Sequence, residues 1–213
     1  MNDIQKLIFT YHNQVPVKEN HGNSPKGVEM SDKIKSLIDS LNNAEDRIEM
    51  AEIFADAVDS GEIEKIDPIT YRSGDYIIRD VLTYVGQRES QFLKELTKKG
   101  ISIAPQFVDS VTKGDYTTIV TKIDGMNGED LIPFSQGYNL LDDAAKRRAF
   151  QDVKKLVQVN LINQAIFTRG NAAIYITPKT KQIVIPSWKM LRPIENDEKQ
   201  SILNDCYNIF FKQ

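Results

Sequence analysis

The sequence has 213 residues, of which 40% are hydrophobic and 27% are charged, and its formal net charge is −3 with a pI near 5.5. This composition is typical of a soluble globular domain with one core of ordinary size, and it excludes a disordered chain. The acidic balance argues against a nucleic-acid binder, because contacts with phosphates need a basic surface. We therefore expect a soluble protein that binds no nucleic acid.

Targeting segments and metal motifs are not predicted. No apolar run approaches the ~20 residues that cross a bilayer, and the first residues lack the basic start and long apolar centre of a signal peptide. The single cysteine, Cys206, excludes an internal disulfide. His12 and His21 lie far from any cysteine or acidic cluster with ligand spacing, so no metal site is expected.

Residues 1–30 are predicted to form a flexible extension. Residues 13–27 collect Pro, Gly, Asn, Ser and Lys with little apolar content, which is typical of a linker. Before them, Ile4, Leu7, Ile8 and Tyr11 have helical spacing. Two interpretations stay open: a plain flexible tail, or a short amphipathic segment that docks on a partner or on the domain.

Residues 31–213 are predicted to form one domain of mixed helices and strands. Apolar residues at helical spacing predict helices at 31–41, 44–59, 88–99, 141–166 and 197–211. Alternating patterns predict strands at 69–71 and 75–85, a hairpin at 105–125, and a second hairpin that pairs 174–176 with 183–185. Residues 133–139 are predicted to be loop.

One long stretch near the C-terminus lacks acidic residues. None occurs between Asp152 and Glu195, although even spacing of the 30 in the chain would place about six there. The same stretch holds seven basic residues: Lys154, Lys155, Arg169, Lys179, Lys181, Lys189 and Arg192. This pattern fits either an ordinary solvated face or a docking patch for an acidic partner.

The order of elements resembles a minimal protein-kinase-like fold. YIIRDV resembles the third strand of a kinase, RESQFLKEL its αC helix, and IVTKIDGMNGEDL the hinge with the start of the next helix. AIFTRGNAAIYI resembles the catalytic loop and QIVIPSW the strand that leads to Asp-Phe-Gly. The resemblance covers residues ~60–190 and implies an α+β fold with a small antiparallel-sheet N-lobe, about 31–124, and a reduced helical C-lobe, about 125–213. A helical extension precedes the sheet.

The resemblance assigns a nucleotide-binding pair to this chain. Phosphoryl transfer uses a lysine, held by a glutamate, to grip phosphates. Arg79 stands at the lysine position and Glu89 at the glutamate position, and a guanidinium can still hold a phosphate. No Gly-x-Gly-x-x-Gly precedes the strand, so weak binding of nucleotides is expected. Alternatively, Arg79 and Glu89 form only a surface ion pair.

The catalytic and metal-binding positions of the family are replaced. Aligning AAIYI with the strand after the catalytic loop puts Thr168 at the catalytic Asp, Ala173 at the metal-binding Asn and Pro186 at the Asp of Asp-Phe-Gly. If the alignment with the kinase loop is shifted by two residues, Asn171 takes the place of the metal-binding Asn. Alternatively, Thr168 to Asn171 only make a tight turn around Gly170. Mg²⁺ prefers oxygen ligands with one or two carboxylates, so binding of ATP with Mg²⁺ is doubtful and no cofactor is expected.

These losses resemble those of a pseudokinase. We expect an inactive interaction protein, similar to minimal kinase-like type III effectors that bacteria inject into host cells, located in the cytoplasm or secreted without a cleavable signal peptide. Its partner would be another protein, either from a host or acidic, bound through Lys179, Lys181, Lys189 and Arg192. Trp188 and Met190 are expected in the core. Two alternatives stay open: an enzyme with non-standard nucleotide-dependent transferase chemistry, and an unrelated α+β fold.

Overall fold

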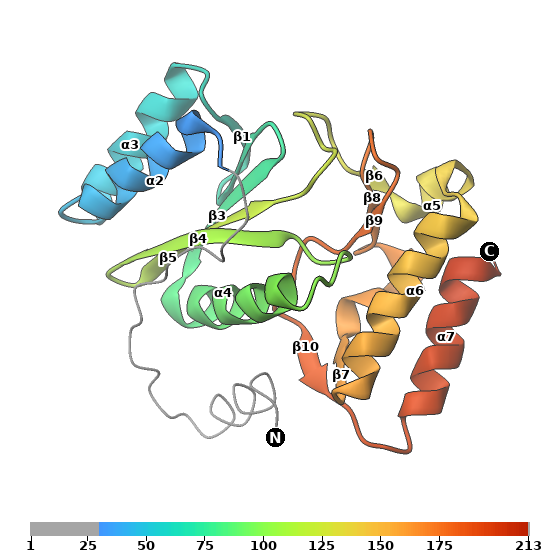
Figure 1. Ribbon diagram of the computed structural model, residues 1–213. Coiled ribbons are helices and arrows are strands. Elements are labelled where there is room, and N and C mark those ends of the chain that lie inside the picture. The colour runs from blue at the N-terminus through green and yellow to red at the C-terminus, as the bar shows by residue number, and fades with distance from the viewer. Residues whose placement is uncertain (1–29, 213) are drawn as a thin grey trace.

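The computed structural model describes residues 30–212, which form two lobes (Figure 1). The N-terminal lobe is built on an antiparallel sheet of five strands in the order β1-β2-β3-β5-β4. The strands are β1 (Glu64–Asp67), β2 (Thr70–Ser73), β3 (Tyr76–Leu82), β4 (Gln106–Lys113) and β5 (Tyr116–Lys122). Helix α4 (Thr83–Lys98) connects β3 to the hairpin of β4 and β5, so the lobe has the succession of strand, helix and hairpin that the resemblance to small kinases predicts.

Two helices, α2 (Asp32–Asn43) and α3 (Arg47–Asp59), cover the outer face of this sheet (Figure 1). Side-chain oxygens of Ser31 and Asp46 accept hydrogen bonds from the first free backbone N–H groups and so fix where the helices begin. The predicted apolar stripe of α2 is buried against sheet residues such as Tyr71, Ile78 and Val120. We call residues 30–63 the helical cap, and this cap shares one hydrophobic core with the sheet.

Helix α4 lies on the opposite face of the sheet, and Gly86 sets how closely it approaches. A Cβ at position 86 would lie 2.6 Å from Cβ of Thr117 on β5, which is too short for any real contact. Only glycine therefore allows α4 to pack at this depth. The result is that Phe92, Leu93 and other buried residues of α4 join the core that continues into the second lobe.

The C-terminal lobe packs helix α6 (Asp143–Gln158) beside α7 (Lys199–Phe211), as Figure 1 shows. Its short strands form two small sheets in the orders β6-β8-β9 and β10-β7. The remaining elements are β6 (Ile132–Pro133), α5 (Phe134–Gly137), β7 (Leu161–Asn163), β8 (Tyr175–Ile176), β9 (Ile183–Val184), β10 (Leu191–Pro193) and the 3₁₀ turns Tyr138–Leu140, Gln164–Phe167 and Arg169–Asn171. None of the helices in residues 30–212 is long and apolar enough to cross a membrane.

Several predicted boundaries are wrong. The long helix predicted to reach residue 166 ends at Gln158, because Asn160 adopts φ of 60° and its carbonyl accepts the N–H of Ile194. The following residues form β7. Helix α4 begins at Thr83 rather than Arg88, so residues 83–85, predicted to end the strand, form the first helical turn. The predicted loop 133–139 contains the short helix α5.

The predictions for the first 29 residues, a flexible extension with a possible partner-binding segment, lie outside the described residues. Within the described part, Trp188 is fully buried as expected. Met190 is 42% exposed, so the prediction that it lies in the core is wrong. It follows the buried Trp188 by two residues, just before β10.

Candidate functional site

Arg79 on β3 and Glu89 on α4 form an ion pair within the N-terminal lobe, between the sheet and the helix that packs on it. Nη2 of Arg79 lies 2.8 Å from Oε1 of Glu89, and the two side chains are 17% and 1% exposed. A surface pair would be far more accessible, so the alternative of a surface ion pair is wrong. The pair exists because Gly86 lets α4 approach the sheet, which brings the next turn of the helix to β3.

The loop after β9 meets Glu89 from the other lobe. The backbone N–H of Trp188 donates to Oε1 of Glu89 at 2.7 Å. The indole N–H of Trp188 donates to the carbonyl of Ile185 at 2.8 Å, which fixes the ring in the core. One carboxylate therefore holds both a cation from the sheet and a backbone amide from the C-terminal lobe.

Asn163, at the end of β7, links the predicted catalytic loop to the segment that contains Ser187 and Trp188. It is fully buried, and its Nδ2 donates to the carbonyl of Ser187 at 2.9 Å while its Oδ1 accepts the N–H of Ala165 at 3.0 Å. Asn163 is not among the site residues predicted from the sequence. A polar side chain directly after the apolar pair Leu161 and Ile162 is the signal that could have indicated it.

Thr168 and Ala173 are in contact in the structure. The hydroxyl of Thr168 donates to the carbonyl of Ala165 at 3.0 Å and accepts the N–H of Ala173 at 3.2 Å. Gly170 and Asn171 have positive φ angles of 67° and 54°, as expected for a tight turn. The Thr168 side chain thus closes the loop that a catalytic Asp would occupy.

Asn171 and Pro186 offer little to a metal ion. Asn171 is half-buried and stabilises the turn through its backbone, whose carbonyl accepts the N–H of Ile174 at 3.0 Å. Pro186 is half-buried and lies just before Ser187 and Trp188, whose backbone atoms make the contacts with Asn163 and Glu89. No carboxylate occurs from residue 153 to residue 194, so these loops supply none of the oxygen ligands that Mg²⁺ prefers.

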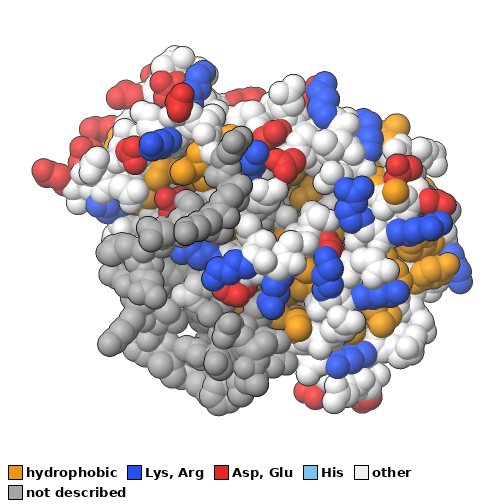
Figure 2. Space-filling view, viewed as in Figure 1, with side chains coloured by type: hydrophobic (Ala, Val, Ile, Leu, Met, Phe, Trp, Pro, Cys, Tyr) orange, Lys and Arg blue, Asp and Glu red, His pale blue; other side chains and the backbone are white. Residues whose placement is uncertain are grey.

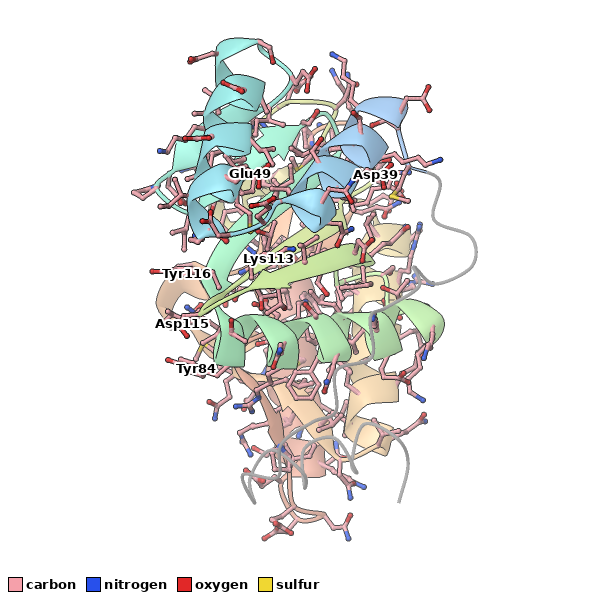
Figure 3. All side chains as sticks on the ribbon, turned by 90° about the vertical axis from the view of Figure 1, so that its left-hand side faces the viewer. Asp39, Glu49, Tyr84, Lys113, Asp115 and Tyr116 are labelled. Atoms are coloured by element: carbon pink, nitrogen blue, oxygen red, sulfur yellow. The ribbon has the colours of Figure 1, made fainter. Side chains whose placement is uncertain are left out.

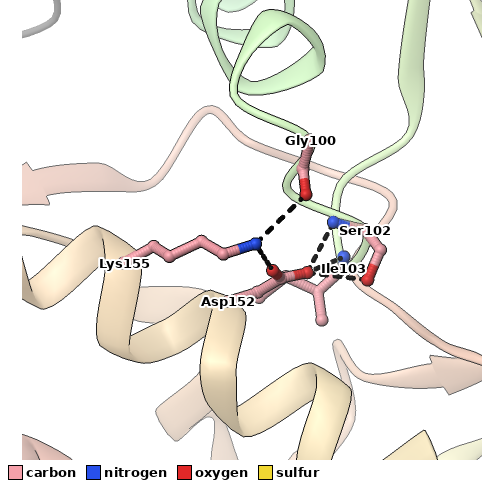
Figure 4. A network of polar contacts seen from close by, with 5 residues as sticks. All are labelled: Gly100, Ser102, Ile103, Asp152 and Lys155. Carbon is pink, nitrogen blue, oxygen red and sulfur yellow. Dashed lines mark hydrogen bonds and ion pairs between the residues drawn. The ribbon is translucent and has the colours of Figure 1, made fainter.

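Asp152, the nearest acidic residue before this stretch, is already bound to other groups of the protein (Figure 4). Its Oδ2 accepts the hydroxyl of Ser102 at 2.7 Å and the backbone N–H groups of Ser102 and Ile103 at 2.5 and 3.2 Å. Its Oδ1 pairs with Nζ of Lys155 at 2.8 Å. Asp152 thus anchors the loop after α4 to helix α6. Among residues 30–212, no cluster of three or more His, Cys, Asp or Glu side chains could hold a metal ion.

An apolar cluster joins the two lobes beside the Arg79–Glu89 pair. Ile77, two residues before Arg79 and therefore on the same face of β3, packs with side chains from the connection after β5 and from the β8-β9 hairpin. The other members are Ile123, Met126, Leu131, Tyr175 and Val184. Here the sheet packs directly on the small hairpin of the C-terminal lobe.

The turn between β8 and β9 binds the connection after β5 by polar contacts. The hydroxyl of Thr180 donates to the carbonyl of Asp124 at 3.2 Å, and the N–H of Lys179 donates to the carbonyl of Gly125 at 3.0 Å. Gly125 has φ of 88°, and a Cβ there would lie 2.4 Å from Oγ1 of Thr180. Together with the contacts of Glu89 and Asp152, these bonds fix the lobes relative to each other at three places in the described chain.

The four basic residues predicted to bind a partner do not form one patch. Lys179 pairs with Glu129, and Nζ of Lys181 donates to the carbonyl of Pro178, both at the β8-β9 turn. Arg192 lies on β10 and pairs with Glu198 at 3.0 Å. Lys189 is exposed. Three of the four cations are therefore neutralised or held within the protein itself.

A pocket of about 610 Å³ lies at the lobe junction, between the end of α4, the end of β5 and the β8-β9 hairpin. Lys122 and Asp124 line it, with their charged atoms 3.1 Å apart. Burial alone would lower the pKa of Lys122, but its hydrogen bond and charge interaction with Asp124 raise it. The cation is thus already paired.

The chain was also compared with known proteins. Neither a protein-family model nor a curated protein matches the sequence. Among solved structures, a kinase from Cydia pomonella granulovirus is similar with a TM-score of 0.45 and 11% identity, over 67% of this chain and 57% of the viral chain. This chain therefore spans less than two thirds of that kinase.

A Toxoplasma protein, described as a divergent kinase that lacks the glycine-rich loop and regulates membrane ultrastructure of the parasitophorous vacuole, is similar with a TM-score of 0.46 and 12% identity. That similarity covers 83% of this chain and 74% of the parasite chain. Independently of these alignments, the sheet order β1-β2-β3-β5-β4, the α4 connection and the Arg79–Glu89 pair describe a kinase-like α+β fold.

Proposed function

We propose that this protein is a catalytically degenerate kinase-like protein that acts by binding another protein. One observation carries the proposal: the loops that face the Arg79–Glu89 pair contain no carboxylate from residue 153 to residue 194. Phosphoryl transfer in kinases depends on an Asp that orients the hydroxyl and on Asp and Asn ligands for Mg²⁺. The residues present do not fit a Mg²⁺–ATP complex.

The contacts between the lobes support the same proposal. Thr168 uses its hydroxyl to close the loop, and Glu89 holds a backbone amide as well as Arg79. Contacts of Asp152, Glu89 and Thr180 tie the lobes together. A rigid pair of lobes suits a binding surface, whereas kinases that turn over nucleotide use lobe motions.

Thermal melts with ATP, with and without Mg²⁺ or Mn²⁺, test the loss of nucleotide function. We expect no change in melting temperature and no metal-dependent hydrolysis of ATP. A rise of several degrees that disappears in Arg79→Met would contradict the proposal, because a ligand that binds the native state raises its stability. Arg147→Met, which removes an exposed cation on α6, is the matched control.

A second function, a transferase with non-standard nucleotide chemistry, is favoured by one observation. Oε2 of Glu89 and the hydroxyl of Ser187 are buried and have no hydrogen-bond partner within the described residues. Buried polar atoms are normally satisfied, so a ligand or water fits there. Mass spectrometry of lysate proteins incubated with the protein, ATP and Mg²⁺ or Mn²⁺ tests it; modification that Glu89→Gln abolishes would establish this function in place of the first.

The role of a bacterial effector delivered to a host cell stays part of the proposal. It is supported by the polar composition of residues 13–27. A translocation assay with a reporter fused to the C-terminus tests it, with a variant that lacks residues 2–29 as the control. Delivery of the variant that lacks residues 2–29 would show that these residues are not a secretion signal.

A further inference from the structure

Four large apolar side chains are exposed together at the end of the N-terminal lobe that faces away from α6 and α7. They are Ile48 at 70%, Leu82 at 45%, Tyr84 at 71% and Tyr116 at 36% exposure. We call these four residues the distal patch. Single exposed apolar residues are common on protein surfaces, but a contiguous group of them indicates an interaction site.

Contacts within the protein place the four residues at the same end of the sheet. Leu82 on β3 lies opposite Tyr116 on β5 in the sheet register, and the N–H of Thr83 donates to the carbonyl of Asp115 at 2.8 Å. The guanidinium of Arg47 lies 4.5 Å from the ring centre of Tyr116, which places the adjacent Ile48 at the same end. In Figure 3, Tyr84, Asp115 and Tyr116 project from the same side of the molecule.

Acidic side chains are frequent in the helical cap, and three of them, Glu45, Asp46 and Glu49, lie next to Arg47 and Ile48 at the end that carries the patch. Residues 30–67 contain eleven acidic residues, all exposed, and four basic ones, whereas residues 68–213 contain more basic than acidic residues. Figure 2 shows these acidic side chains over α2 and α3. The eleven are Asp32, Asp39, Glu45, Asp46, Glu49, Glu52, Asp56, Asp59, Glu62, Glu64 and Asp67.

Helix stability does not account for this charge. Asp46 and Glu49 lie at the beginning of α3, where negative charge is favourable. Asp56 and Asp59 lie in its last turn, which has no basic residue, and there negative charge opposes the helix dipole. Mutual repulsion of so many exposed carboxylates also opposes folding.

We propose that the distal patch binds a segment of a partner protein that presents an apolar anchor flanked by Lys or Arg. This inference rests on the proposed function in that both require a protein partner. Tyrosine rings are frequent anchors in interfaces, and complementary charge steers association and selects the partner. The sequence predicted a basic surface for an acidic partner, formed by Lys179, Lys181, Lys189 and Arg192, whereas this proposal has an acidic surface for a basic partner. Three of those four basic residues are engaged within the protein.

Three synthetic peptides of equal length test the proposal. The first alternates Arg with Leu around one central Trp, the second has Glu in place of Arg, and the third has Ser in place of Leu and Trp. Binding to the full chain is measured by fluorescence anisotropy at several salt concentrations. We expect the first peptide to bind at least tenfold more tightly than the other two, with an affinity that falls as salt rises.

Variants locate the binding. Ile48→Ser with Tyr84→Ser should weaken the first peptide at least tenfold, because both side chains are exposed and their loss leaves the fold intact. Glu45→Gln with Glu49→Gln should weaken it about threefold and reduce the salt dependence. The matched controls are Leu140→Ser and Asp197→Lys, which are exposed on the C-terminal lobe and should change affinity less than about twofold.

Other outcomes overturn the inference. Equal binding of all three peptides, tighter binding of the Glu peptide, or no binding would each do so. So would affinity that the distal variants leave unchanged. Dimerisation in sedimentation experiments that Tyr84→Ser abolishes would show that the occupant is a second copy instead. None of these results bears on the nucleotide melts, so this inference and the proposed function can fail independently.

Discussion

The backbone N–H of Trp188 donates to the carboxylate of Glu89 across 99 positions of sequence, and the same carboxylate oxygen lies 2.8 Å from the guanidinium of Arg79. Glu89 is almost completely buried. Its position therefore depends on contacts from both lobes, and the orientation of the lobes depends on it in turn.

Replacing Glu89 by Ala should destabilise the protein by about 3 kcal/mol, because it leaves a buried cation and a buried amide without a partner. The melting temperature should fall by about 6–12 °C. Glu95→Ala, on the same helix and paired with Lys98, is the control and should cost less than about 1 kcal/mol. Equal effects of the two substitutions would show that Glu89 does not connect the lobes.

Gly86→Ala should destabilise the protein by about 1–3 kcal/mol, although alanine favours helices over glycine. The added Cβ would lie 2.6 Å from Cβ of Thr117, so α4 or β5 has to move. Denaturation in urea measures the change, and the neighbouring Gln87→Ala is the control. A stabilising effect of Gly86→Ala would mean that the helix packs less closely than described.

Asp152→Ala should cost about 3 kcal/mol, since it removes the acceptor for the N–H groups of Ser102 and Ile103. Hydrogen exchange of these two amides should become faster than in the wild type. Lys155→Ala removes only the half-exposed partner of Asp152 and should cost less than about 1 kcal/mol. Unchanged protection of both amides in Asp152→Ala would contradict the predicted anchor.

Asp109→Asn should stabilise the protein at neutral pH. Burial raises the pKa of Asp109 above its usual value of 3.8, although the N–H of Ser110 and the charge of Lys94 lower it in part. The folded state therefore binds the proton more tightly than the unfolded state. The wild type loses stability as pH rises from about 3.8 through the raised pKa, and the variant does not.

We expect the melting temperature of Asp109→Asn to exceed that of the wild type by about 2 °C at pH 7, with a difference that vanishes below about pH 3.8. Asp115→Asn, which changes an exposed carboxylate at the β4-β5 turn, is the control. A difference that grows as pH falls would have the wrong sign and would contradict the burial of Asp109.

The thiol of Cys206 should not react in the native state. It is fully buried on α7, and burial, with a smaller effect of Asp205, raises its pKa to about 12. Because the thiolate is the reactive form, a thiol reagent at pH 8 should label it only as fast as the protein unfolds. Addition of urea should accelerate labelling, and fast labelling without urea would show that α7 opens readily.

Periodicity predicted much of the fold. The apolar stripe of α2, the strands β2 and β3 and the β4-β5 hairpin follow from local pattern, and each is present in the structure, whereas β1 was not predicted. The pairing of Arg79 with Glu89 followed from the family resemblance and is also present. Whether these residues bind a nucleotide stays a prediction.

Other parts depend on contacts that no local pattern contains. The end of α6 at Gln158 depends on Asn160, whose carbonyl bonds to Ile194 far along the chain. The role of Asn163 depends on where Ser187 lies. The acid-free stretch suggested a basic binding surface, but Glu129 and Glu198, which neutralise Lys179 and Arg192, lie outside that stretch.

The helical cap also determines how far the chain can be shortened. Ile34, Leu41, Met50 and Phe54 are buried against the outer face of the sheet, and Tyr71 stacks on Phe54 with ring centres 4.7 Å apart. A fragment that begins at β1, as the resemblance to a kinase sheet would suggest, would expose this whole face to water and aggregate. The smallest folding unit of this lobe therefore begins near Ser31, about thirty residues before its first strand.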